Sequence, residues 1–364
     1  MWLLAKRTAV VLGAGLALAA ALAFIYASRW VLIAFLFAIF LADLLAPLVS
    51  RIQQWKKVSR GSRTIAILEV YAIGGVVILL LAIFVGPRIG EEIRRLGAAL
   101  PELLEKVNSG QIVRQFGATH GWSYETQVRL ESFLAHHSGT ALSLETQFGE
   151  YAGEFARSVV WFLLIPIPAF FFLKDGRNFA EEVIQMVERT RPQRLVRRLF
   201  EDLNQMVAHY VRAQLALAGL AMAVYTLVFW LMGLPYSFAL SSIAGILEFI
   251  PVVGPAVAAV VVVSISFLEN YPHLLIVVLF LGIWRFVQDY VISPRVMGAN
   301  LEMHPLAAIF AVLVGAEVWG VVGVYLSIPI MASLRILWRS WHRYAEMQAQ
   351  MQAKTQLETR RPAA

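Results

Sequence analysis

The stretch FALSSIAGILEFIPVVGPAVAAVVVVSISFL, residues 238–268, is apolar almost throughout and is interrupted at its centre by Pro251-Val-Val-Gly254-Pro255. As one straight helix it would measure about 45 Å, which exceeds the roughly 30 Å hydrocarbon core of a bilayer. Proline removes a backbone donor and clashes with the preceding helical turn, whereas glycine permits a sharp turn. The stretch is therefore predicted to be either a tilted, kinked span or a re-entrant hairpin of two half-helices.

A second long apolar segment, residues 305–334, carries glycines at its centre, namely Gly315, Gly320 and Gly323. This segment allows the same two structures. The distribution of Lys and Arg favours two hairpins over two kinked spans, because Arg295 then falls on the cytoplasmic side, where basic loops gather. We therefore expect two hairpins that enter the membrane from opposite faces.

The composition of the whole chain is typical of a membrane protein. Of its 364 residues, 59% are hydrophobic and 15% are charged, whereas a soluble domain has about 25% charged residues. The mean hydropathy is +0.68. Six further segments are long and apolar enough to span a bilayer as helices: 8–27, 30–50, 64–86, 151–173, 206–232 and 274–292. The predicted fold is all-α, a polytopic integral membrane protein with six to eight transmembrane helices and two re-entrant or broken-helix hairpins.

Charge divides the chain into membrane and polar parts. The loop at 51–63 has five Lys or Arg and no acid, and the C-terminal tail is also basic. The positive-inside rule therefore places both termini in the cytoplasm of a multi-pass inner-membrane protein. The predicted parts are N-terminal membrane helices at 1–86, an extracytoplasmic helical domain at 87–150, a membrane helix at 151–175, a cytoplasmic amphipathic helix at 176–205, a membrane transport core with interrupted helices at 206–338, and a basic cytoplasmic tail at 339–364.

Charged side chains inside the apolar segments are the candidates for function, because they are costly in lipid and usually face a polar cavity or a partner. Glu248 is the only charge in the first interrupted segment, and Glu317 is the only charge in the second. Arg285 and Asp289 lie four residues apart in segment 274–292, so a helix would place them on one face.

Two interpretations of these charges stay open. Broken helices expose backbone groups that can coordinate substrate or ions at the membrane midplane. Alternatively, Arg285 and Asp289 form a structural pair, and the two glutamates are solvated at hairpin tips. On the first interpretation, the residues of the substrate or ion pathway are Glu248, Pro251, Gly254, Pro255, Arg285, Asp289, Arg295, Gly298, Gly315, Glu317 and Gly320.

The sequence carries no enzyme signature. It has no P-loop, no His-Glu-x-x-His and no Gly-x-Ser-x-Gly, so we expect neither an enzyme nor ATP as an energy source within this chain. The adjacent pair His136-His137 fits a surface position better than a metal site, and no cofactor or metal is expected. The net charge of +7 arises between apolar segments, so nucleic acid is not an expected partner.

Four groups of residues follow one another along the chain. They are Pro166-Ile-Pro168 with Phe171-Phe172-Leu173-Lys174-Asp175-Gly176; Glu248-Phe-Ile-Pro251-Val-Val-Gly254-Pro255; Ile292-Ser-Pro294-Arg295-Val-Met-Gly298 with His304-Pro305-Leu306; and Gly315, Gly320 and Gly323 with Ile328-Pro329. In order and spacing they resemble the autoinducer-2 exporter family of bacterial transporters over nearly the whole chain. Glu302 and Ala316-Glu317 depart from the pattern beside the presumed pathway, which leaves the substrate open.

The resemblance implies export of a small polar molecule such as autoinducer-2 without ATP. Some family members look like sodium/proton antiporters, so a monovalent cation is the alternative substrate. The resemblance also implies a homo-oligomer, such as a pentamer, within membrane lipid. A non-transporting membrane scaffold is a third hypothesis, and costly charges at helix breaks argue against it.

Overall fold

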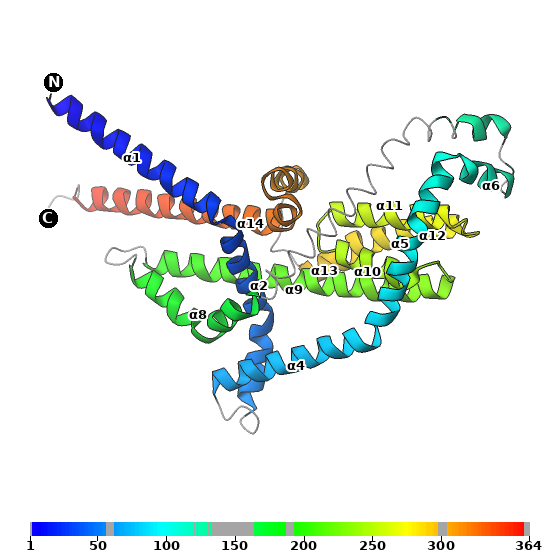
Figure 1. The fold of residues 1–364 in the computed structure, drawn as a ribbon. Helices are drawn as coiled ribbons and strands as arrows, with labels where there is room; N and C mark the ends of the chain where they lie inside the picture. The colour runs from blue at the N-terminus through cyan, green and yellow to red at the C-terminus, as the bar shows by residue number, and fades with distance from the viewer. Residues whose placement is uncertain are drawn as a thin grey trace. The chain divides into compact units, whose positions relative to one another are not determined.

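A computed structural model gives the fold, and the residues that it describes are all helix and connections, with no strand among them (Figure 1). The described residues are 2–55, 62–119, 121, 123–129, 132, 164–186, 193–297 and 304–359. The chain divides into two compact units. The first holds Met1–Val70 and Tyr151–Phe179, and the second holds Tyr71–Glu150 and Ala180–Ala364.

The described part of the first unit consists of α1 (Trp2–Ala27), α2 (Arg29–Gln54) and the first parts of α4 (Arg63–Phe84) and α8 (Pro166–Met186). Contacts of two kinds join the described part of α8 to other helices of this unit. Arg63 Nε donates a hydrogen bond to the Leu173 carbonyl oxygen at 2.6 Å. Phe35 packs edge-on against Phe172 with ring centroids 6.1 Å apart. Aromatic and backbone contacts therefore hold this unit together.

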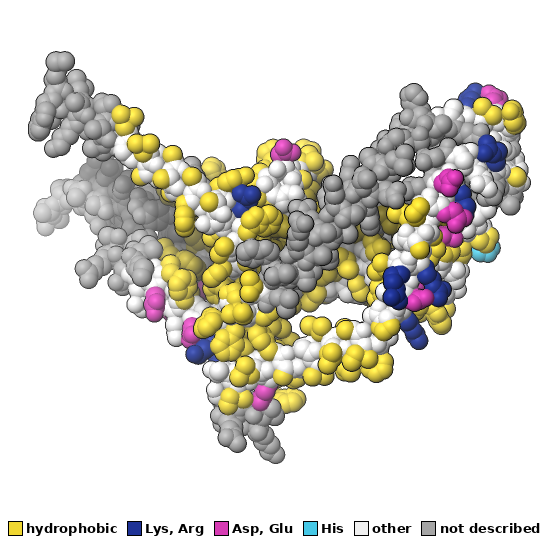
Figure 2. Space-filling model, in the orientation of Figure 1, with side chains coloured by type: hydrophobic (Ala, Val, Ile, Leu, Met, Phe, Trp, Pro, Cys, Tyr) yellow, Lys and Arg dark blue, Asp and Glu magenta, His cyan; other side chains and the backbone are white. Residues whose placement is uncertain are grey.

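The predicted membrane spans are largely confirmed. Helices long and apolar enough to cross a membrane contain the predicted spans 30–50, 206–232 and 274–292 and cover residues 64–84 of the predicted span 64–86. The predicted span 8–27 lies in α1, whose segment Gly15–Ala27 is a shorter apolar helix. Most of the predicted span 151–173 lies outside the described residues. Apolar side chains cover much of the visible surface of α4, as a lipid solvent requires (Figure 2).

The second unit is built on α9 (Gln193–Met232), a continuous helix of 40 residues. The predicted amphipathic segment 176–205 is not one helix, because its two ends belong to α8 and α9. Arg197 of α9 binds Glu181 of α8 through both guanidinium nitrogens, although a straight helix would separate these residues by about 24 Å.

The described residues of the polar segment 87–150 are mostly helical. They include helices α5 (Gly86–Asn108) and α6 (Gln111–Thr119). Their apolar faces bury Leu103 and Val113, and α5 also packs against the helices of the membrane core. The pair His136-His137 lies outside the described residues.

Residues 238–268 form a helical hairpin. Helix α10 (Ser237–Leu247) and helix α11 (Val253–Leu268) pack against each other on either side of a break at 248–252. Their lengths of 11 and 16 residues correspond to about 16 and 24 Å, so neither crosses the hydrocarbon core alone. The ends of the hairpin meet, because the Tyr236 hydroxyl donates to Glu269 Oε1 at 3.0 Å. The hairpin alternative therefore describes this segment, and the kinked span does not.

The remaining helices of the second unit are also interrupted. Helix α12 (Leu274–Val287) continues through a π-helical turn, η1 (Gln288–Ile292), into α13 (Ser293–Met297). Helix α14 (Pro305–Thr359) is broken at Trp319 and Gly320, which have non-helical dihedral angles. A Cβ placed on Gly315 would lie 2.3 Å from the carbonyl oxygen of Gly323. The predicted break in 305–334 thus forms a corner at which two glycine backbones touch.

Replacing Gly254 by alanine tests the close approach at the turn of the hairpin. A Cβ there would lie 1.7 Å from the carbonyl oxygen of Leu247, and this backbone atom cannot move aside as a flexible side chain could. We expect Gly254→Ala to lower the free energy of unfolding by about 1–3 kcal/mol, as overpacking does. Thermal unfolding of the purified protein in detergent measures the change.

Gly282→Ala on α12 is the matched control, because no atom lies within 4 Å of the added Cβ. Alanine favours a helix over glycine by about 1 kcal/mol, so this variant should unfold at or above the wild-type temperature. Equal losses of stability in both variants would contradict the close approach.

Candidate functional site

Glu248 lies at the break of the hairpin and is buried there. It caps the C-terminus of α10, and its backbone N–H donates to the Ala244 carbonyl oxygen at 3.1 Å. Only 5% of the residue is exposed. Its Oε1 accepts a hydrogen bond from Gln288 Nε2, whereas Oε2 is buried without a hydrogen-bond partner among the described residues. A carboxylate in this position is poised to accept a further hydrogen bond or a cation.

Arg285 joins two carboxylates. Its Nη1 lies 3.4 Å from Glu248 Oε1, and its Nη2 lies 2.7 Å from Asp289 Oδ1. The pair that the i,i+4 spacing predicts is therefore formed, and it extends to Glu248. The Arg285 and Asp289 side chains are 38% and 41% exposed, so the cluster runs from the buried carboxylate to the surface of the unit. Two carboxylates and one guanidinium give the cluster a formal charge of −1 when all three are ionised.

Two glutamines complete the site. Gln288 begins the π-helical turn η1 and is buried; such turns occur often at functional sites. Gln214, on α9, is also buried and donates from Nε2 to the Glu248 carbonyl oxygen at 2.7 Å. A search for charged residues overlooks both glutamines. The sequence did offer a signal for both, because each is a glutamine inside an apolar span: Gln214 in 206–232 and Gln288 in 274–292.

The backbone beside Glu248 is strained. Val252 has φ 66° and ψ −53°, and the N–H of Val253 bonds to the Pro251 carbonyl oxygen at 2.7 Å. This is a γ-turn of the rare form with positive φ, which a β-branched residue adopts only at a cost in energy. Strain of this kind persists where the surrounding packing imposes it, and it clusters at functional sites.

The structure gathers some of the predicted pathway residues and separates others. Pro251, Gly254 and Pro255 lie at the break beside Glu248, with Gly254 and Pro255 buried. Arg295 is exposed on α13, and Gly298 lies outside the described residues.

The predicted residues on α14 lie apart from this cluster. Gly315, Glu317 and Gly320 belong to the corner of α14, a helix that packs against α9. Glu317 is exposed, and no hydrogen bond or ion pair within the described part of the chain joins it to Glu248. In the same part of the chain, no three His, Asp or Glu side chains gather as a metal centre would require.

The chain matches a family of transporters and is similar to proteins named as putative transport proteins and permeases. The model of the AI-2E family transporter matches residues 16–343. Over 316 residues, 85% of this chain and 86% of the relative, it is 26% identical to "Putative transport protein YrrI" of Bacillus subtilis. It is 23% identical to "Putative transport protein YueF" of the same organism over 75% of each chain. It is 25% identical to "Putative permease PerM" of Escherichia coli over 50% of this chain and 52% of that protein.

Replacing Val252 by glycine tests the strain at the break. Glycine adopts positive φ without steric cost, so we expect Val252→Gly to raise the free energy of unfolding by about 1 kcal/mol. Val253→Gly is the matched control, because Val253 begins α11 and glycine there should lower stability by about 0.5–1 kcal/mol. Thermal unfolding in detergent compares the two. If Val252→Gly destabilises the protein as much as Val253→Gly does, the turn is not strained.

Proposed function

Because the chain belongs to the AI-2E family of transporters and is a multi-pass membrane protein, we propose that it is a secondary carrier that exports a small polar solute such as autoinducer-2 without ATP. The observation that supports this proposal most directly is the buried Glu248 carboxylate at the hairpin break, with one oxygen free of protein partners among the described residues.

The chemistry of the cluster suits a hydroxyl-rich solute. A solute that leaves water needs polar partners at depth, because an unpaired polar group in a low-dielectric environment is costly. Glu248 and Asp289 accept hydrogen bonds from hydroxyl groups, and Arg285 donates to carbonyl or hydroxyl oxygens. The strained turn at Val252 borders the same place, and a change in its dihedral angles would move Glu248 relative to Arg285.

A second candidate function is exchange of a monovalent cation, such as sodium, for protons. The observation that favours it is the formal charge of −1 on the cluster, which a bound cation or proton would neutralise. On this proposal, Glu248 is the coupling group, and Arg285 compensates the negative charge of its neighbour Asp289 through their ion pair. We propose for either function a homo-oligomer, such as a pentamer, in the bacterial inner membrane with both termini in the cytoplasm.

Replacing Glu248 by glutamine tests the role of the carboxylate. The side chain keeps its shape and loses its charge, so we expect transport to fall about tenfold to a hundredfold, as expected from the loss of a charged interaction of about 1.5–3 kcal/mol. Flux into proteoliposomes measures the change, with labelled autoinducer-2 in one arm and a sodium-driven pH change in the other. Loss in the first arm alone supports export, and loss in the second arm alone supports antiport.

Two further variants complete this experiment. Glu182→Gln changes an exposed glutamate on α8 and should leave flux at the wild-type rate. Glu317→Gln examines the predicted pathway residue on α14. If it abolishes flux while Glu248→Gln transports normally, the pathway centres on the corner of α14, and the site proposed at the hairpin is incorrect.

Cysteine labelling tests the placement of the hairpin in the membrane. Pro235 and Asn270 flank its two ends, and the sequence has no native cysteine. We expect a cysteine at either position to react with an impermeant reagent from outside the cell, because a re-entrant hairpin returns to the face from which it entered. A reporter fused at Ala364 should be active only in the cytoplasm. Labelling of the two cysteines from opposite faces would contradict a re-entrant hairpin.

A further inference from the structure

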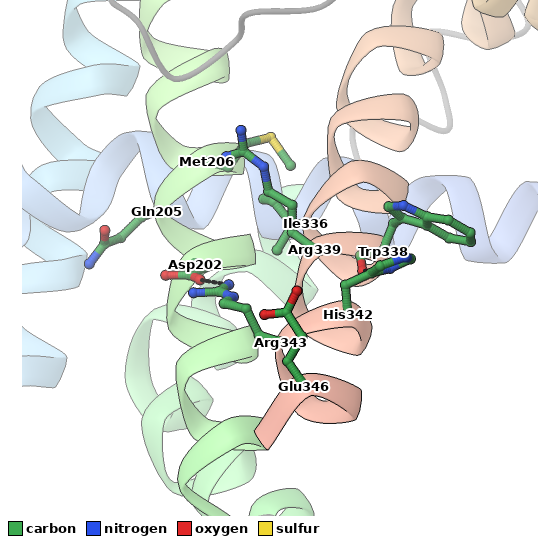
Figure 3. Close-up of a pocket in the computed structure, with 9 residues that line it drawn as sticks. All are labelled: Asp202, Gln205, Met206, Ile336, Trp338, Arg339, His342, Arg343 and Glu346. Carbon is green, nitrogen blue, oxygen red and sulfur yellow. Dashed lines mark hydrogen bonds and ion pairs between the residues drawn. The ribbon is translucent and has the colours of Figure 1, made fainter. Parts of the chain in front are cut away.

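A cleft lies between α9 and α14 where both helices change from apolar to charged. Its volume is about 740 Å³, within the range of about 300–1,000 Å³ that small-molecule sites occupy. Figure 3 shows its lining: Asp202, Gln205 and Met206 from α9, and Ile336, Trp338, Arg339, His342, Arg343 and Glu346 from α14. Apolar and charged side chains therefore share one hollow.

The cleft lies at the point along α9 and α14 where we expect the hydrocarbon core of the bilayer to end and the lipid headgroups to begin. On α14, the exposed side chains of Ile330, Leu334 and Trp338 follow one another at i, i+4 and i+8, so they form one apolar stripe that leads into the cleft. Exposed tryptophans are typical of the membrane–water interface. A lipid acyl chain along this stripe would bring its headgroup to Arg339 and His342.

The charged side chains of the cleft carry both signs. Arg343 approaches Asp202 at 3.8 Å (Figure 3). Arg339 and Glu346 have no hydrogen bond or ion pair within the described part of the chain. The cleft therefore holds one cation, Arg339, and one anion, Glu346, that have no partner among the described residues. Glu346 lies two helical turns after Arg339 along α14, so it is farther along the helix from the apolar stripe than Arg339 is.

We propose that this cleft binds the headgroup of a zwitterionic phospholipid. Arg339 binds the phosphate, because a guanidinium offers several N–H donors to phosphate oxygens. Glu346 accepts hydrogen bonds from the ammonium group that extends beyond the phosphate, and Trp338 packs against the glycerol region. The order along α14 is thus apolar stripe, phosphate site and ammonium site, which is the order of the parts of such a lipid from the bilayer outward.

Lipid titration of the full chain in detergent tests the proposal. Native mass spectrometry would give the dissociation constants of phosphatidylethanolamine and of phosphatidylglycerol, which has the phosphate and lacks the ammonium group. We expect phosphatidylethanolamine to bind more tightly. Arg339→Gln should weaken both lipids about tenfold, the effect of losing one charge-assisted hydrogen bond. Glu346→Gln should weaken phosphatidylethanolamine and leave phosphatidylglycerol unchanged.

Arg335→Gln is the matched control, because Arg335 lies one turn before Arg339 on α14 and does not line the cleft. It should bind both lipids as the wild type does. If Arg339→Gln reduces the oligomer or misfolds, Arg339→Lys keeps the charge and should retain intermediate affinity. The proposal is overturned if Arg339→Gln binds like Arg335→Gln, if the wild type does not prefer phosphatidylethanolamine, or if millimolar inorganic phosphate displaces the lipid, which would indicate a free-anion site.

Discussion

The burial of the Glu248 carboxylate is the constraint on which the second unit depends. An unpaired buried charge costs several kcal/mol, so the surrounding helices must supply partners. Gln288 and Arg285 approach its side chain from η1 and α12, and Gln214 of α9 binds its carbonyl oxygen. Apolar helices in lipid have little hydrophobic force to fix their mutual register, and packing and hydrogen bonds do so instead. The polar contacts of Glu248 therefore define how α9, α12 and η1 align with the hairpin.

Both interrupted segments also depend on close contact between backbone atoms. At the hairpin, Gly254 lies against the carbonyl of Leu247; at the corner of α14, Gly315 and Gly323 lie against each other. A Cβ at any of these positions would meet backbone atoms, so the chain reverses or bends there only because the side chain is absent. The hairpin adds a strained turn at Val252 and a carboxylate, whereas Glu317 on the corner of α14 is exposed. The two breaks are thus similar in backbone packing and different in chemistry.

Much of the fold follows from the sequence because lipid imposes simple rules on length, hydropathy and charge. Pro251 and Gly254 indicated the hairpin, Gly320 indicated the break in α14, and the spacing of Arg285 and Asp289 indicated their ion pair. The contact of Arg285 with Glu248 joins residues 37 positions apart, so no local pattern specifies it. Gln214 and Gln288 were not predicted as site residues because an amide carries no charge, and one glutamine does not prevent a long apolar segment from spanning the membrane. The extra residue per turn in η1 likewise has no sequence signature.

Helix α9 connects these features, because it is continuous from the cleft to the hairpin. Its 40 residues contact the hairpin through Gln214, α13 through His209, which bonds to the Met297 carbonyl oxygen at 2.8 Å, and α14 through Tyr210, which donates to the Tyr325 carbonyl oxygen at 3.3 Å. Asp202 of the same helix lines the cleft at the apolar boundary. Asp202 and Gln214 are twelve residues apart, or about 18 Å along a helix. Because the helix between them is unbroken, a lipid bound in the cleft beside Asp202 would lie against the same helix that positions Glu248 through Gln214.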